Sequence, residues 1–354
     1  MAVRLLATLL APADRRGIEI RDDLPVAPRE YLETFHDPVY VERVRLASGG
    51  ARRQPLDGGD TPSFKGCYEA ASRIASGAAW AVGTAIESQH PTFHPAGGLH
   101  HAHPDRASGF CIFNDLALAI GDATRSGQKV AYLDIDAHHG DGVMYGFYDS
   151  GQVLDIDFHQ DGRTLFPGTG FPKESGSGDG AGLKVNVPLP PGAGDEALLP
   201  LFRRLVPPLL RAFRPDVIVL QHGADGHAGD PLTALNYTSR SYDQIDRLVL
   251  AMGRELCHSR VVFTGGGGYR PEAVARVLAR AGAFALGLEV PAHEAPLPPA
   301  WRSEFEKEWG RPAPETWVDP LPPSRAVPQT GWMTGVVGEL EKVLGVSLPP
   351  VGPA

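Results

Sequence analysis

The sequence has few cysteines and no long apolar stretch. Cys67, Cys111 and Cys257 are its three cysteines, and none forms a CxxC pair. A sparse, odd set argues against a disulfide framework and is typical of a reducing compartment, so we expect a cytoplasmic protein. No apolar run approaches the ~18 residues of a membrane span, which excludes a membrane protein of the helical class.

Basic residues are also scarce. The 33 Lys and Arg are outnumbered by 42 Asp and Glu, giving a formal net charge of −9, and no block of five basic residues occurs. A protein that gains affinity by neutralising phosphates needs a basic surface, so we expect no nucleic-acid partner. Hydrophobic residues make up 42% and charged residues 21%, which excludes disorder over most of the chain.

Helical periodicity alternates with short apolar runs along the chain. The first residues carry one Arg and a short apolar run, as an export signal does, but Leu5, Leu6, Leu9 and Leu10 are spaced as one face of a helix. Helices are predicted over Arg4–Leu10, Pro38–Ala47, Gly66–Ser88, Asn114–Ser126, Gly194–Phe213, Ser239–Cys257 and Pro271–Ala285. Strands are predicted over Lys129–Asp134, Val153–His159, Leu183–Val187, Val217–Gln221 and Val261–Thr264.

Continuous apolar strands between helices indicate a parallel sheet covered on both faces, hence an α/β fold. We expect a single domain over residues 1–288 and a loop-rich C-terminal extension, 289–354, that packs on it and ends in a helix near Met333–Leu344. The extension holds Trp301, Trp309, Trp317 and Trp332, too many large aromatics for a disordered tail.

Acidic and histidine side chains gather just after the predicted strands, where ligands bind in open α/β sheets. Asp136 and His138 follow one strand, and Asp225 follows another. Residues i and i+2 of an extended chain point to one side, so Asp136 and His138 can reach one point. Two carboxylates and one imidazole form a three-ligand set that leaves a position open on a divalent metal, with Zn²⁺ the first candidate. The alternative is that both acids cap helices.

Further groups suited to acid–base chemistry flank this set. His100 and His101 are adjacent, while Asp134 and Asp141 bracket the expected ligands and could each orient one imidazole. Tyr269 follows four glycines, Gly265 to Gly268, which would let the backbone approach a substrate and aim a phenol at its carbonyl. The alternative for this run is a mobile turn. Together these groups predict general acid–base hydrolysis.

Five motifs in this order resemble the signature set of the zinc-dependent histone deacetylase superfamily: GGLHHAHPDRASGFCIFND, YLDIDAHHGDGV, FPGTG, GADGHAGDP and GGGGY. The run QHGADGHAGDPLTALNYT and the tryptophan-containing tail most resemble its bacterial acetoin utilization branch. The resemblance covers about Pro25 to Ala285 and, more loosely, the tail. It implies a three-layer arginase/deacetylase-like fold and a hydrolase that removes acetyl groups from lysine side chains, with a metabolic enzyme such as an acyl-CoA synthetase as one protein substrate.

The resemblance also implies roles for individual residues. It places Zn²⁺ on Asp136, His138 and Asp225, the general base on His101 with Asp141, and an electrostatic helper on His100 with Asp134. Tyr269 matches the family's oxyanion-stabilising tyrosine. The substrate-binding positions that it implies are Asp60 at the rim, Gly109, Phe110 and Phe166 in the tunnel walls, and Gly267 in the glycine run. A structural K⁺ is implied near Asp134, Asp136, His138, Asp157 and Phe158, although relatives often carry a serine at position 157.

One departure and three alternatives stand beside this interpretation. Family members usually begin with a strand and a His-Pro segment ahead of the helix near Arg4, and this sequence has neither. Acetylpolyamine hydrolysis would use the same machinery on a small acetylated amine. An arginase-like enzyme would need a second metal, but Gly140 and His227 occupy the places of its acids. A non-catalytic acyl-lysine binder would have no need of His100, His101 and Tyr269.

Overall fold

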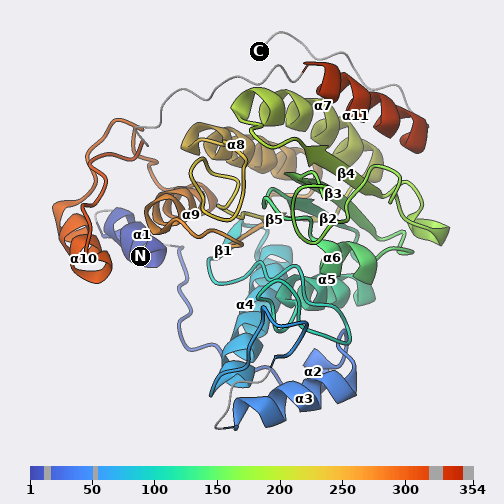
Figure 1. The fold of residues 1–354 in the computed structure, drawn as a ribbon, viewed down its shortest axis with the longest axis horizontal. Coiled ribbons are helices and arrows are strands. Elements are labelled where there is room, and N and C mark those ends of the chain that lie inside the picture. The colour runs from blue at the N-terminus through green and yellow to red at the C-terminus, as the bar shows by residue number, and fades with distance from the viewer. Residues whose placement is uncertain (12–16, 51–54, 319–329, 346–354) are drawn as a thin grey trace.

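The centre of the molecule is a six-stranded sheet in which every pairing is parallel, in the order β1-β6-β5-β2-β3-β4. The computed structural model describes residues 1–11, 17–50, 55–318 and 330–345. The strands are β1 (Thr92–His94), β2 (Val130–Asp134), β3 (Val153–Gln160), β4 (Lys184–Leu189), β5 (Val217–Gln221) and β6 (Val261–Thr264). A parallel sheet needs helices on both faces, and Figure 1 shows them.

Helices cover the sheet in two layers because side chains alternate along each strand. In β2, Ala131 and Leu133 join a core with α7 (Asp195–Phe213), α8 (Ser239–Leu256) and α11 (Thr330–Leu344). Val130 and Tyr132 face α4 (Cys67–Ser88) and α5 (Asp115–Arg125) on the other side. The remaining α-helices are α1 (Ala2–Leu10), α2 (Arg29–Leu32), α3 (Pro38–Ser48), α6 (Asp141–Gly146), α9 (Pro271–Ala285) and α10 (Pro299–Trp309). The expected three-layer α/β architecture is confirmed (Figure 1).

The predicted elements agree with the structure to within a few residues at each end. Five elements were not predicted: β1, α2, α6, the 3₁₀ helix η1 (Gly178–Gly180) and α10. The strand and the first two helices are too short to show a period. Helix α10 lies in the segment expected to be rich in loops, where Trp301 and Phe305 pack against Leu5 and Leu6 of α1 and Ala279 of α9. The leucine-rich start is therefore a helix with a buried face, as its spacing predicts.

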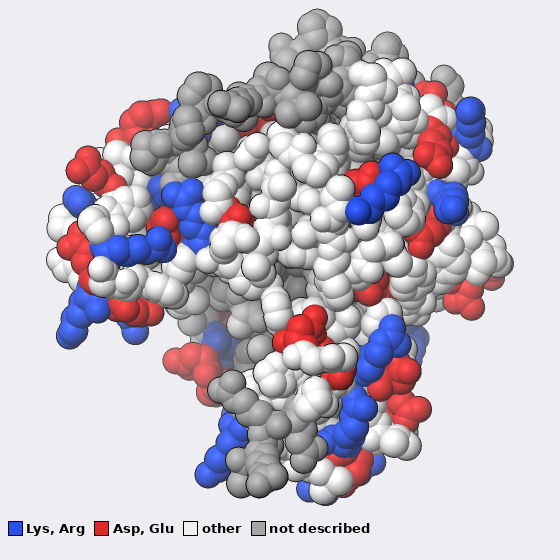
Figure 2. All heavy atoms as spheres, viewed as in Figure 1, with Lys and Arg blue, Asp and Glu red and all other residues white. Residues whose placement is uncertain are grey.

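The carboxyl ends of the strands meet along one edge of the sheet. Asp134, the last residue of β2, pairs with Gln221 of β5 and Asp157 of β3. The loops that follow β2, β5 and β6 therefore begin side by side at this edge. No helix within the described ranges is long and apolar enough to cross a bilayer. Figure 2 shows one face of the molecule, on which basic and acidic side chains are interspersed and lie mainly toward the margins.

Candidate active site

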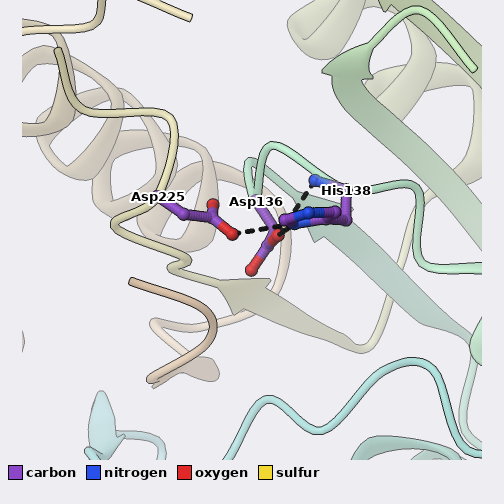
Figure 3. Close-up of side chains that lie close together, drawn as sticks. All are labelled: Asp136, His138 and Asp225. Atoms are coloured by element: carbon purple, nitrogen blue, oxygen red, sulfur yellow. Dashed lines mark hydrogen bonds and ion pairs between the residues drawn. The ribbon is translucent and has the colours of Figure 1, made fainter. Parts of the chain in front are cut away.

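Asp136, His138 and Asp225 converge above the edge of the sheet (Figure 3). All three are buried, and their ligand atoms lie within 4.8 Å of one another. Nδ1 of His138 lies 2.9 Å from Oδ2 of Asp225 and 3.2 Å from Oδ1 of Asp136. The segment from Asp136 to His138 is bent rather than extended. The bend, and not the alternation of side chains along an extended strand, therefore brings the Asp136 and His138 side chains together. Within the described ranges, this is the one group of His, Cys, Asp or Glu with metal-ligand spacing.

Neighbouring groups fix the two carboxylates. Oδ2 of Asp136 accepts hydrogen bonds from Nε2 of Gln221 at 3.0 Å and from the Gly267 N–H at 2.8 Å. Oδ1 of Asp225 accepts from the Ala137 N–H at 2.7 Å, which leaves Oδ2 directed at His138. The residues lining the surrounding cavity include no Lys or Arg that would compete for the carboxylates. The donor set and its orientation therefore fit a divalent metal with three protein ligands.

Two histidine–carboxylate pairs lie beside this group. His100 Nδ1 is 2.8 Å from Oδ2 of Asp134, and His101 Nδ1 is 2.7 Å from Oδ1 of Asp141. Because each carboxylate takes the Nδ1 side, both Nε2 atoms point away from it and lie 3.1 Å from one another. Burial by itself would lower the pKa of either imidazole. For His100, the negative charges of Asp134 and Asp136 outweigh burial and raise the pKa to about 10. For His101, burial and the neighbouring His100 lower the pKa to about 4.

Aromatic and glycine residues enclose the approach to these groups. An inner cavity of about 260 Å³ is lined by both histidines, the three expected metal ligands, Gly267 and Tyr269. An outer cavity of about 240 Å³ adds Asp60 and Phe166, and Gly109, Phe110, His101 and Tyr269 line both. The Phe110 and Tyr269 rings lie 5.9 Å apart, and the His101 and Phe166 rings 5.1 Å apart. Burial raises the pKa of Tyr269 far above its usual value, which keeps its O–H available as a donor.

Gly109 lines both cavities and, because it has no side chain, allows the backbone to approach the His101 ring closely. It adopts φ +51°, and a Cβ atom added there would lie 2.3 Å from Cδ2 of His101 and 3.0 Å from Cε1 of Phe166. We expect Gly109→Ala to lower the free energy of unfolding by about 1–3 kcal/mol, because the added methyl group forces the His101 ring to move. The displaced ring should also make substrate hydrolysis slower. Urea denaturation and kcat measure the two effects.

Gly127→Ala is the matched control for that substitution. Gly127 also has a left-handed backbone, with φ +83°, but a Cβ atom there would meet nothing within 4 Å. Its stability should fall by no more than about 1–2 kcal/mol, the cost of the backbone conformation alone, and its kcat should not change. Equal losses of stability and of kcat in the two variants would show that the close contact between position 109 and the His101 ring affects neither quantity.

Several residues that hold the site together were not singled out from the sequence. Tyr132 O–H donates to Oδ2 of Asp134 at 2.5 Å, and Asn114 Nδ2 donates to the His100 and Ala102 carbonyls. Asp115 accepts the N–H groups of Gly98 and Leu99, just before the histidine pair. Only Gln221 carried a usable signal, as the polar last residue of an apolar strand. The other three are ordinary strand and helix-start residues whose partners are distant in the chain.

The region of the expected K⁺ site is also brought together, because β2 and β3 pair Asp134 with Asp157. Oδ2 of Asp157 accepts from the Gly140 N–H at 2.7 Å, and Oδ1 is 2.6 Å from Nδ1 of His159. This carboxylate therefore already has two protein partners. The K⁺ site stays a prediction.

The chain belongs to the histone deacetylase family, a family of hydrolytic deacetylases, because residues 4–283 match the histone deacetylase domain. Among its relatives are two acetoin utilization proteins named AcuC. The protein from Bacillus subtilis (strain 168) is 39% identical over 308 residues, 83% of this chain and 78% of that protein. The protein from Staphylococcus aureus (strain Mu50 / ATCC 700699) is 34% identical over 340 residues, 93% of this chain and 87% of that protein.

The fold agrees with that of a solved relative. A crystal structure of an HDAC homolog complexed with SAHA superposes with a TM-score of 0.80 at 28% identity, covering 97% of this chain and 93% of that one. The family and the fold that the five motifs predict are thus confirmed.

Proposed function

We propose that this protein is a zinc-dependent, AcuC-like deacetylase that hydrolyses acetylated lysine side chains. The observation that carries the proposal is the meeting of a buried three-ligand set with two histidine–carboxylate pairs at the base of an aromatic-walled cavity. The relatives are named for acetoin utilization. A soluble acetylated metabolic enzyme, such as an acyl-CoA synthetase, is therefore the protein substrate that we propose over a DNA-bound histone.

The proposed reaction assigns one task to each group. Zn²⁺ held by Asp136, His138 and Asp225 would polarise the acetyl carbonyl and make water a stronger acid. Nε2 of His101 takes a proton from the water that attacks the carbonyl carbon, and Asp141 stabilises the imidazolium that forms. The Tyr269 O–H donates to the oxyanion. When the C–N bond breaks, an imidazole returns a proton to the leaving lysine amine.

The enclosing residues select the substrate in this proposal. Phe110 and Phe166 are half exposed and would flank the aliphatic stem of the lysine. Asp60 lines the outer cavity, where a carboxylate can accept a hydrogen bond from the substrate backbone. Gly267 lines the inner cavity and lies so near the ligands that an added Cβ would be 2.3 Å from Oδ2 of Asp225. A side chain at position 267 would therefore enter the space that the metal and the acetyl group need.

Hydrolysis of an acetyl-lysine peptide by the purified, chelated and zinc-reloaded protein tests the proposal. We expect chelation to abolish acetate release and Zn²⁺ to restore it, because chelation removes the Lewis acid that would polarise the acetyl carbonyl. Acetylated polyamines assayed in parallel distinguish the small-amine alternative, since faster hydrolysis of those substrates would favour it. Absence of acetate release from every substrate after reloading would refute the enzymatic proposal.

A further inference from the structure

We propose that His103 is a positioning residue for His101, acting through the carboxylate that the two imidazoles share. This inference rests on the proposed function, because it assigns a task within the same reaction. His103 lies two residues after the expected general base and outside the residues that line either cavity. It therefore does not touch the substrate.

The shared carboxylate is that of Asp141, the first residue of α6. Oδ1 lies 2.7 Å from Nδ1 of His101, and Oδ2 lies 3.0 Å from Nε2 of His103. Each oxygen thus has its own imidazole, and bonds at both ends stop the carboxylate from rotating about its Cβ–Cγ bond. Burial alone would raise the pKa of Asp141, but the bonds from His101 and His103 outweigh it and lower the pKa well below its usual value.

His103 is itself held in place, as a positioning residue must be. Its carbonyl oxygen is 3.0 Å from Nδ1 of His36, and its N–H donates to the Arg106 carbonyl at 3.0 Å. Its ring stacks on Tyr145 of α6, with centroids 6.4 Å apart and planes at 23°. The side chain of His103 is 11% exposed, so its bond to Asp141 is largely shielded from water.

The consequence concerns kcat rather than substrate binding. With both oxygens bonded, Asp141 holds the His101 ring with Nδ1 toward itself and Nε2 toward the cavity. If His103 can no longer bond Oδ2, the carboxylate gains rotational freedom and His101 spends less time in the orientation that accepts a proton. Loss of a hydrogen-bonding partner of this kind typically lowers activity about 10–100-fold.

The experiment compares His103→Phe with His103→Gln in the full-length, zinc-loaded protein. Phe keeps a ring against Tyr145 but loses the donor, whereas Gln places an amide N–H near the position of Nε2. We expect Phe to lower kcat about 10-fold with KM within twofold of wild type, and Gln to recover most of kcat. Zinc content should match wild type in both, and both should be folded at the assay temperature, with Phe melting lower because Oδ2 of Asp141 loses its partner. His90→Phe, the same substitution at an exposed histidine whose Nδ1 lies 2.7 Å from the Ser88 carbonyl oxygen, should retain wild-type kcat.

A second measurement does not depend on turnover. The proton on His101 Nδ1 should exchange with solvent slowly in wild type and His103→Gln, and faster in His103→Phe, as seen by nitrogen-edited NMR of the imidazoles. The role of His103 would be overturned if His103→Phe had the kcat and the Nδ1 proton exchange rate of wild type. It would also be overturned if the Phe and Gln variants lost kcat equally. Either result would leave the deacetylase proposal intact. An inactive wild type would instead overturn the proposed function, and the exchange rates would still decide whether His103 holds Asp141.

Discussion

Asp225→Asn will bind far less zinc than wild type and will lose roughly three orders of magnitude in kcat/KM, a barrier change of several kcal/mol. The substitution removes one of the two negative charges in the ligand set and replaces Oδ2 or Oδ1 by an amide nitrogen that cannot bind a cation. Asparagine keeps nearly the same shape and can still accept the Ala137 N–H through its remaining oxygen, as Asp225 does at 2.7 Å. The fold should therefore survive. Metal content by mass spectrometry and acetate release measure the effect.

Asp216→Asn is the control for this variant. Asp216 precedes β5 and accepts the Lys129 N–H at 2.8 Å, at the opposite edge of the sheet from the candidate site. The Asp216→Asn substitution makes the same chemical change away from the expected metal ligands, so the zinc content and kcat/KM of this variant should equal those of wild type. A fully metallated, active Asp225→Asn protein would exclude Asp225 as a ligand.

Tyr269→Phe will keep its zinc and lose about 100- to 1,000-fold in kcat. The tyrosine is not within the ligand group, so the metal should bind normally. Its O–H is the donor proposed for the oxyanion, and loss of one such donor costs about 2.7–4 kcal/mol of transition-state stabilisation. Its backbone N–H donates to Asp230 at 2.8 Å, and this bond holds the residue in place independently of the phenol. The variant should therefore fold and bind substrate with little change in KM.

A hydroxyl deletion elsewhere shows whether this loss is specific to the position. Tyr145→Phe also removes one phenol oxygen, but that oxygen bonds Glu174 rather than facing the cavity. Its kcat should remain that of wild type. Unchanged turnover in Tyr269→Phe would remove Tyr269 from the reaction, and a joint loss of zinc and turnover would make it a determinant of metal binding instead.

Much of the fold was available from the sequence because its signals are local. Continuous apolar runs such as Val217–Gln221 and the spacing of buried leucines in α7 appear within single segments. The grouping of acids and histidines after β2 and β5 followed from the rule that parallel strands end at one edge. Elements without such signals were missed. The three residues of β1 are too few to show a period, and α10 gains its stability from contacts of Trp301 and Phe305 with distant helices.

The sequence by itself determined the chemical types present, their order and the family, since these are properties of the chain alone. Only the tertiary structure decided the contacts on which function depends. It placed Gln221 on Asp136, Tyr132 on Asp134 and His103 on Asp141, and it showed that Asp136 and His138 converge through a bend. Hydrogen bonds act over about 3 Å and require defined angles, so they depend on how separate segments pack, which no short stretch of sequence specifies.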